Sequence, residues 1–213
     1  MTAVNAGHNA AAARRLPSGR GPLRRLRAAL TILALAVFGV VGSYAAYCGV
    51  IIVEGNFRAV QPGVLYRSAQ LGPGELELFA RGYGIRSVLN LRGANPGRSW
   101  YDGEIAAAHD LGIVHYDYGL SAKRVVTPRQ IVQILAIVRG APKPLLIHCA
   151  SGADRSGLVA ALYDYAIRGE SAAEADRQLS LAYGHFPYLT SRTGAMDRSF
   201  WAFVGAPSNL ARN

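Results

Sequence analysis

The chain has 213 residues, of which 51% are hydrophobic, and a formal net charge of +10 at pH 7. Six of these positive charges precede residue 29, so that residues 29–213 carry only +4. This uneven distribution, without any basic–aromatic pattern, argues against a nucleic-acid-binding protein.

Residues 1–28 form a basic N-terminal segment rich in Ala, Gly and Arg, with no Asp or Glu. A segment of this composition cannot bury enough apolar surface to fold, so we expect it to be disordered. Its arginines are Arg14, Arg15, Arg20, Arg24, Arg25 and Arg27. Arginines that precede an apolar segment remain in the cytoplasm and can contact anionic lipid.

Residues 29–53 are apolar and contain no charged side chain. A run of this length can cross a bilayer as one transmembrane helix. With the basic segment in the cytoplasm, residues 54–213 would lie outside it, in the periplasm or the extracellular space. The alternative is a signal peptide cleaved near Ser43-Tyr44-Ala45, which would release a secreted protein.

Residues 54–213 are long enough for one domain with a hydrophobic core. We expect an entry hairpin over 57–67 and strands over 85–91, 113–118 and 145–148. Helices are expected over 73–81, 100–111, 157–168 and 171–183, and a further one begins at Thr127-Pro128, a cap followed by proline. This alternation predicts an α/β fold, with a central, mostly parallel sheet flanked by helices on both faces.

The segment His148-Cys149-Ala150-Ser151-Gly152-Ala153-Asp154-Arg155-Ser156-Gly157 follows an apolar strand and precedes a helix. A tight loop between a strand and a helix N-terminus binds phosphate through backbone N–H groups. The residues that would line such a site are Ala150, Ser151, Gly152, Ala153, Asp154 and Arg155.

Single residues of this segment fit the same chemistry. Cys149 would be a thiolate nucleophile, favoured by the loop amides, the helix N-terminus and Arg155. The planar guanidinium of Arg155 would hold two phosphoryl oxygens. Ser156 would donate a hydrogen bond to the thiolate, while His148 and Gly157 would support the loop. The alternative is a buried cysteine at a strand end followed by an ordinary helix.

The pattern His-Cys-x5-Arg-Ser-Gly resembles the signature loop of the Cys-dependent protein tyrosine phosphatases, above all the compact dual-specificity branch with its bacterial members. The similarity covers roughly residues 57–183 and includes the segments 64–70 and 87–92. It implies a single dual-specificity-phosphatase-like domain and a two-step reaction through a phosphocysteine on Cys149. It implies no metal and no cofactor.

The general acid of such enzymes is usually an aspartate on a separate loop, and here the sequence leaves two candidates. Asp117 is the only acid in residues 117–126, but it comes early in that segment, where it can equally cap a turn. Asp154 lies inside the phosphate-binding loop, as in lipid-phosphatase-like variants. Asp197 is more remote and fits a helix-terminus or ion-pair residue better.

Lys123 and Arg124 would bind a second phosphate or an acidic headgroup, or form a solvated turn. His185 would line the pocket rim or pack in the core. With Cys48 in the membrane segment and Cys149 in the loop, we expect no internal disulfide.

The expected activity is phosphomonoester hydrolysis on phosphoprotein. The alternatives are an inositol-phosphate or phospholipid-headgroup phosphatase, a phosphate-binding pseudophosphatase and, less well matched in loop length, a sulfurtransferase.

Overall fold

The computed structural model describes residues 21–206, which fall into two compact units that divide after Ala45. Helix α1, Gly21–Val53, crosses this division. It is long and apolar enough to span a membrane, with a mean hydropathy of 2.0 and no buried residue in its most apolar window. Length and composition alone support that assignment.

The start of α1 corrects one expectation. Residues 21–28 were expected to belong to a disordered segment, but they are helical. Pro22 suits a first helical turn, and the Leu, Arg and Ala residues after it have high helix propensity. The rest of the predicted basic segment, residues 1–20, lies outside the described residues.

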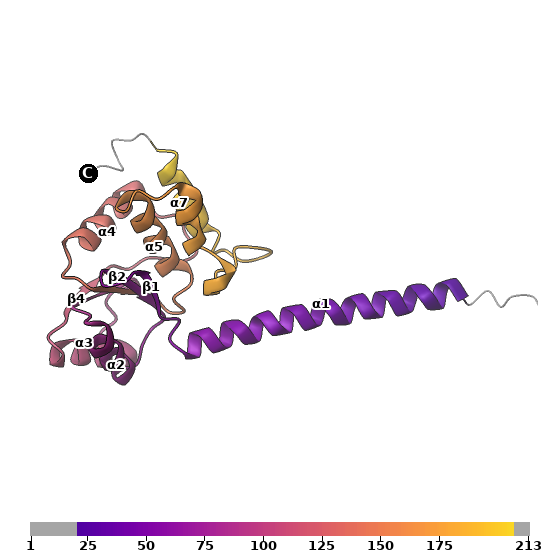
Figure 1. The fold of residues 1–213 in the computed structure, drawn as a ribbon, viewed down its shortest axis with the longest axis horizontal. Coiled ribbons are helices and arrows are strands. Elements are labelled where there is room, and N and C mark those ends of the chain that lie inside the picture. Colours follow the sequence, from indigo (N-terminus) through magenta and orange to yellow (C-terminus); the bar gives the residue numbers. More distant parts are fainter. Residues whose placement is uncertain (1–20, 207–213) are drawn as a thin grey trace, which may run out of the picture. The chain divides into compact units, whose positions relative to one another are not determined.

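A five-stranded sheet forms the centre of the second unit, with the strand order β1-β2-β5-β3-β4. The strands are β1 (Arg58–Gln61), β2 (Leu65–Ser68), β3 (Ser87–Asn90), β4 (Val114–Asp117) and β5 (Leu145–His148). Only β1 runs antiparallel to its neighbour, as the predicted entry hairpin requires. The carboxyl ends of the four parallel strands therefore meet at one edge, where open α/β sheets bind ligands (Figure 1).

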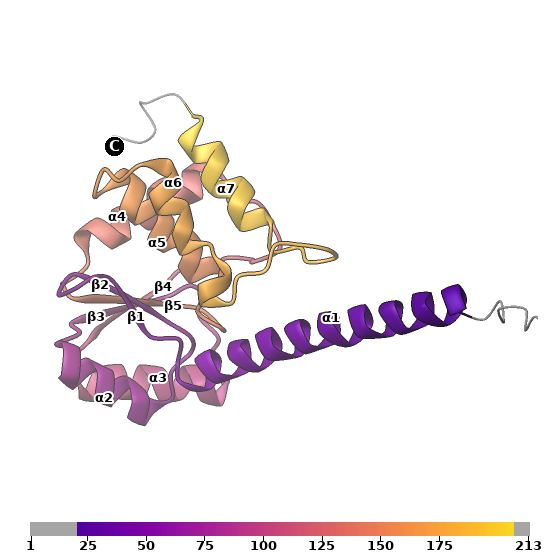
Figure 2. The same ribbon diagram turned by 45° about the vertical axis from the view of Figure 1, so that its right-hand side comes forward.

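Helices cover both faces of the sheet, which confirms the predicted fold class (Figure 2). One face carries α2 (Pro73–Tyr83) and α3 (Ser99–Asp110). The other carries α4 (Pro128–Gly140), α5 (Asp154–Ala166), α6 (Ala172–Ala175) and α7 (Ala195–Val204). All four residues of β5 are buried, as a central strand covered on both faces requires.

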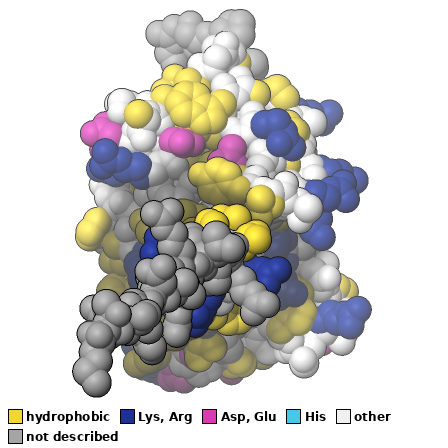
Figure 3. Space-filling model, turned by 90° about the vertical axis from the view of Figure 1, so that its right-hand side faces the viewer, with side chains coloured by type: hydrophobic (Ala, Val, Ile, Leu, Met, Phe, Trp, Pro, Cys, Tyr) yellow, Lys and Arg dark blue, Asp and Glu magenta, His cyan; other side chains and the backbone are white. Residues whose placement is uncertain are grey.

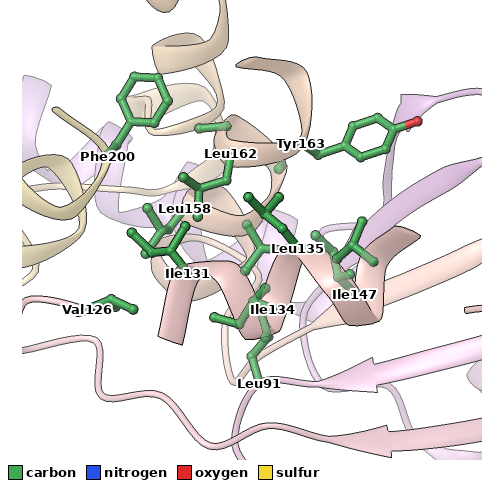
Figure 4. Close-up of a cluster of buried hydrophobic side chains, with 14 of the residues drawn as sticks. Leu91, Val126, Ile131, Ile134, Leu135, Ile147, Leu158, Leu162, Tyr163 and Phe200 are labelled. Atoms are coloured by element: carbon green, nitrogen blue, oxygen red, sulfur yellow. The ribbon is translucent and has the colours of Figure 1, made fainter. Parts of the chain in front are cut away.

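Each face has its own hydrophobic core. The larger core packs α4, α5 and α7 onto the sheet and includes Leu91, Ile131, Ile134, Leu135, Ile147, Leu158, Leu162 and Phe200 (Figure 4). The apolar face of α4 supplies four of its buried residues, at the helical spacing expected from the sequence. The smaller core lies beneath α2 and α3. The two cores hold β5 from both faces and so fix the position of its carboxyl end, where the loop after β5 begins.

The helix predicted over residues 171–183 is wrong beyond its first turn. The capping box at Ser171 is present, but α6 ends at Ala175 and two 3₁₀ turns follow, Asp176–Gln178 and Leu181–Tyr183. The carbonyl of Gln178, at the end of the first of these turns, accepts a hydrogen bond from Arg67 Nη1 of β2 at 2.8 Å. This contact joins the turn to the sheet.

Candidate active site

The loop Cys149–Arg155 connects the carboxyl end of β5 to the N-terminus of α5. Cys149 is a free thiol that is 1% exposed. Gly152 has a φ of +73°, and a Cβ on it would lie 2.7 Å from the backbone nitrogen of Ala69. Only glycine fits that position, because both the backbone angle and the close approach of the neighbouring chain exclude a side chain.

Four consecutive carbonyl groups of the Cys149–Arg155 loop accept hydrogen bonds from neighbouring elements. The Ala150 carbonyl accepts from the backbone of Gln70 at 3.2 Å. The Ser151 carbonyl accepts from Asn56 Nδ2 at 2.9 Å. The carbonyls of Gly152 and Ala153 accept from Arg67 Nη2 at 2.7 and 3.1 Å.

These contacts determine the direction of the loop amides. In a trans peptide the N–H points away from the preceding C=O. Because the carbonyls of residues 150–153 face the surrounding elements, the N–H groups of residues 151–154 point to the opposite side of the loop. Consecutive amides directed this way form an anion-binding nest, and the N-terminus of α5 adds its positive dipole end.

Arg155 is oriented by two backbone carbonyls. Its Nη1 atom donates to the oxygens of Leu91 and Leu120, both at 3.2 Å. Its Nε atom is buried and has no hydrogen-bond partner in the described part of the chain. A buried donor without a partner is costly, and an oxyanion held in the nest would satisfy it. The guanidinium is therefore held through Nη1, while its Nε–H has no protein acceptor among the described residues.

Arg67 is a second guanidinium behind the loop and is fully buried. Besides the two loop carbonyls, it contacts Gln178, and its Cζ atom lies 4.1 Å from the centre of the Tyr183 ring. Burial lowers the pKa of Arg67 to about 10, so it remains positively charged at neutral pH. It therefore holds the loop and adds positive charge behind the phosphate site.

A hydrogen-bonded network anchors the start of the loop through Glu104 on α3. His148 Nε2 donates to Glu104 Oε1 at 3.0 Å, and His115 Nε2 donates to the same oxygen at 2.7 Å. Gln70 donates to the other carboxylate oxygen. Burial opposes ionisation of Glu104, but the hydrogen bonds from His115 and His148 outweigh it and lower its pKa to about 2. His148 is thus oriented by a buried carboxylate, in line with its expected supporting role.

Asp117 lies at the end of β4, two strands from β5. Asn90 Nδ2 donates to its Oδ1 at 2.8 Å, and the Tyr101 hydroxyl donates to its Oδ2 at 2.6 Å. The hydrogen bond to Asp117 raises the pKa of Tyr101 to about 12, which keeps the phenol as the donor. Both oxygens of Asp117 therefore accept hydrogen bonds, one from the neighbouring strand β3 and one from α3.

Asp154 is the first residue of α5 and contacts a buried histidine. His185 is 0% exposed; its Nδ1 donates to Asp154 Oδ1 at 2.7 Å and its Nε2 donates to Asp197 Oδ2 at 2.9 Å. Burial disfavours the charged imidazole, but the hydrogen bonds to the two aspartates outweigh it and raise its pKa to about 9. Of the two positions considered for His185, the structure has the packed one, with Asp197 as its ion-pair partner on α7.

The remaining predicted residues lie at or near the loop. The Ser156 hydroxyl is buried and donates to the carbonyl of Ser68 at 3.4 Å. A Cβ on Gly157 would lie 2.8 Å from the Gln178 carbonyl, so glycine allows that turn to approach α5. Lys123 and Arg124 are exposed, and Arg124 lines a cavity of about 300 Å³ together with Leu120, whose carbonyl holds Arg155.

Sequence reasoning assigned no role to Arg67, Asn56 or Glu104. A signal for Glu104 is present, since a carboxylate three residues after Tyr101 and four before Ala108 falls on the buried face of α3. Arg67 lies in a segment that carries the family resemblance. The contacts of Asn56 span 95 residues or more of sequence, and no local pattern marks them.

The comparisons with known proteins agree with this geometry. Residues 108–169, which include the Cys149–Arg155 loop, match the tyrosine phosphatase family. The structure resembles Pseudomonas aeruginosa TpbA, with 23% identity and a TM-score of 0.56 over 75% of this chain and 89% of that one. The core catalytic domain of the PP-IP phosphatase SIW14 from Saccharomyces cerevisiae shares 20% identity, with a TM-score of 0.53 over 67% of this chain and 83% of that one. No curated protein sequence matches this chain significantly.

The loop lies between a parallel β-strand and a helix, with a buried cysteine at its start and an arginine at its end. The chain is thus similar to the tyrosine phosphatase family over residues 108–169 and to the solved phosphatase structures in fold.

Proposed function

We propose that the chain hydrolyses phosphomonoesters on phosphoprotein, as a tyrosine or dual-specificity phosphatase, through a phosphocysteine on Cys149. The observation that carries the proposal is the set of four outward-facing carbonyls, which directs the loop amides to one side. A resembling structure, TpbA with a cysteine-to-serine change, is in complex with phosphotyrosine, at 20% identity and a TM-score of 0.52 over 70% of this chain and 96% of that one.

In the first step, the Cys149 thiolate attacks phosphorus while the bond from phosphorus to the leaving oxygen breaks. The amides of residues 151–154 and the guanidinium of Arg155 stabilise the charge on the equatorial oxygens. The leaving oxygen takes a proton from the general acid. In the second step, water attacks phosphorus and gives its proton to the same residue, the S–P bond breaks, and inorganic phosphate and the thiolate are released.

We assign the acid role to Asp154 rather than Asp117. Asp154 lies next to Arg155, and only its Oδ1 has a hydrogen-bond partner in the described structure. Both oxygens of Asp117 are already occupied, on the strand at the sheet edge. His185 would orient the Asp154 carboxyl group through the hydrogen bond from its Nδ1 atom.

Arg92 favours a second candidate substrate class, the inositol phosphates or phospholipid headgroups. It follows Leu91, which holds Arg155, and its guanidinium is stacked 3.4 Å from the centre of the Trp100 ring and bonded to Gln70. An arginine oriented in this way beside the phosphate loop, with Arg124 nearby, suits a substrate with more than one phosphate. In Figure 3, Lys and Arg side chains cover more of the visible surface than Asp and Glu.

We also propose that α1 anchors the enzyme, with the N-terminus cytoplasmic and the catalytic unit extracytoplasmic. The membrane segment would end earlier than the predicted residue 53. Ile51 is 3% exposed and the Tyr47 hydroxyl donates to the Ala182 carbonyl at 2.7 Å, so the residues from Ala46 onward belong to the catalytic unit. The helix before Ala46 still provides about 20 residues, enough for a bilayer. A cleaved, secreted form remains the alternative.

The test is hydrolysis by the full chain of a phosphotyrosine peptide, a phosphoserine peptide and an inositol polyphosphate, each compared by kcat/KM. A protein phosphatase would act fastest on a peptide, whereas a preference for the inositol polyphosphate of tenfold or more would select the second candidate. If the chain binds inorganic phosphate but hydrolyses none of these substrates or an activated aryl phosphate, it is a pseudophosphatase and the proposal is wrong.

A further inference from the structure

The residue that holds the Ser151 carbonyl comes from outside the phosphatase motif. Asn56 lies three residues after the end of α1 and is fully buried. Its Nδ2 atom donates to the Ser151 carbonyl at 2.9 Å and to the Tyr183 carbonyl at 3.0 Å. One side-chain amide therefore joins the Cys149–Arg155 loop to the turn at residues 181–183.

The backbone around Asn56 is held as firmly as its side chain. Its N–H donates to the Ile51 carbonyl at 2.6 Å, which closes the end of α1. The carbonyl of Gly55 accepts from the backbone of Ala69 at 2.7 Å. Asn56 has a φ of +43°, a conformation that asparagine tolerates better than most residues. These backbone hydrogen bonds therefore fix the position from which the Asn56 side-chain amide contacts the loop.

We propose that Asn56 is a positioning residue of the active site, which orients the Ser151–Gly152 peptide so that the Gly152 N–H faces the bound phosphate. The inference rests on the proposed phosphate-binding function of the loop. Of the four outward carbonyls, two are held by Arg67 and one by backbone, and only that of Ser151 depends on Asn56. Without this contact the peptide can rotate, and the site loses one preorganised donor.

This role makes the junction between α1 and the sheet part of the catalytic machinery. The same short segment closes the helix, contacts the loop that follows β2 and fixes the phosphate loop. A displacement of the C-terminal end of α1 would therefore move the Asn56 side chain and, with it, the Ser151 carbonyl of the phosphate loop.

The experiment compares Asn56→Gly and Asn56→Asp with Tyr47→Phe in the full chain in detergent. Glycine accepts the positive φ and removes only the amide. Tyr47→Phe is the matched control, because it removes a hydrogen bond between α1 and the same turn, at the Ala182 carbonyl, and leaves the Asn56 side chain in place. The readouts are kcat/KM for an activated aryl phosphate, the affinity for inorganic phosphate and the thermal midpoint.

We expect Asn56→Gly to weaken phosphate binding and to lower kcat/KM by about tenfold or more, while Tyr47→Phe stays within about twofold of the unmodified chain. Asn56→Asp adds a pH readout. Its carboxylate repels the Ser151 carbonyl, but its protonated form can donate to it, so activity relative to the unmodified chain should rise towards acidic pH.

Unchanged phosphate affinity and kcat/KM in Asn56→Gly would overturn the inference, as would a flat pH ratio for Asn56→Asp. Failure of both variants to fold would also overturn it, because Asn56 would then serve the fold rather than the loop. An unmodified chain without hydrolytic activity would contradict the proposed function instead, and the phosphate affinities would still decide the role of Asn56.

Discussion

Arg67 Nη2 donates a hydrogen bond to the carbonyl of Gly152 at 2.7 Å, which places a fully buried guanidinium directly behind the loop that begins with Cys149. Charge-assisted hydrogen bonds of this kind contribute about 1.5–3 kcal/mol each. The same side chain donates to the carbonyl of Gln178, in the 3₁₀ turn that follows α6. Arg67 therefore contacts both the loop and the turn beside it.

Replacing Arg67 should accordingly impair both stability and phosphate binding. We expect Arg67→Met to lower the free energy of unfolding by about 3 kcal/mol or more, because it leaves the carbonyls of Gly152 and Gln178 without this donor. Arg67→Lys should recover part of the stability but not the paired contacts with Gly152 and Ala153. Denaturant unfolding measures the effect on stability, and binding of inorganic phosphate measures the effect on the loop. A near-unchanged phosphate affinity in both variants would contradict a role of Arg67 in holding the loop.

Cys149→Ser should lower turnover by about 10³-fold or more, because a serine hydroxyl is a far weaker nucleophile than a thiolate. Binding of inorganic phosphate should survive, since the amides and Arg155 remain in place. Hydrolysis of an activated aryl phosphate and equilibrium phosphate binding check the two halves of this prediction. Substantial residual activity would show that another residue attacks phosphorus.

The choice between Asp154 and Asp117 is tested with leaving groups of different quality. Loss of a general acid costs about 10²–10⁴-fold, and the cost falls on poor leaving groups that need the proton. We expect Asp154→Asn to slow phosphotyrosine hydrolysis far more than hydrolysis of an activated aryl phosphate. Asp117→Asn should affect both substrates alike, and the reverse result would move the acid role to the end of β4.

His185 should make the stability of the catalytic unit depend on pH. Its pKa is raised from 6.5 to about 9 in the folded chain, so the folded state holds the proton more tightly. This contribution, about 3 kcal/mol, is fully present below pH 6.5 and is lost as pH rises through 9. Denaturant unfolding at pH 6 and pH 9.5 should show the decline in the unmodified chain but not in His185→Gln.

The exposed His109 provides the control for that measurement, since its side chain is 88% exposed and lies beside the equally solvated Asp110. His109→Gln should leave the pH dependence of unfolding unchanged. If the free energy of unfolding fell equally with pH in the unmodified chain, His185→Gln and His109→Gln, titratable groups other than His185 would cause the pH dependence.

The anchor can be tested by placing reporters at the C-terminus. An extracytoplasmic catalytic unit predicts activity from a periplasmic reporter and none from a cytoplasmic one.

A second comparison uses chains that begin at Ala46 or at Phe57. The longer one keeps the Ile51 and Asn56 contacts and should bind inorganic phosphate, whereas the shorter one should bind it weakly.

The sequence predicted the parts of the molecule that depend on local patterns. Hydrophobic periodicity identified α4 and its buried face, and capping residues located its start at Thr127. The spacing from Cys149 to Arg155 predicts a phosphate-binding loop, because such a loop needs a fixed number of residues to encircle an anion, and this segment lies between β5 and α5.

What the sequence did not predict depends on contacts between distant segments. The helix expected at residues 171–183 ends at Ala175, and the 3₁₀ turn after it contacts Arg67, 111 residues away in sequence. The supporting residues Asn56, Arg67 and Glu104 contact Ser151, Gln178 and His148, which are 95, 111 and 44 residues away in sequence. Spacing patterns carry no information about such pairs until the fold is known.

The continuity of α1 limits which molecules the proposed anchored enzyme can reach. The helix runs without a break from Gly21 through the division after Ala45 to Val53, so no separate linker joins the proposed membrane segment to the catalytic unit. Without such a linker, the catalytic unit cannot search the surrounding solution as it would on a long tether. Its encounters would be set by lateral diffusion in the plane of the bilayer, and phosphate groups carried by other membrane-bound molecules would meet it most often.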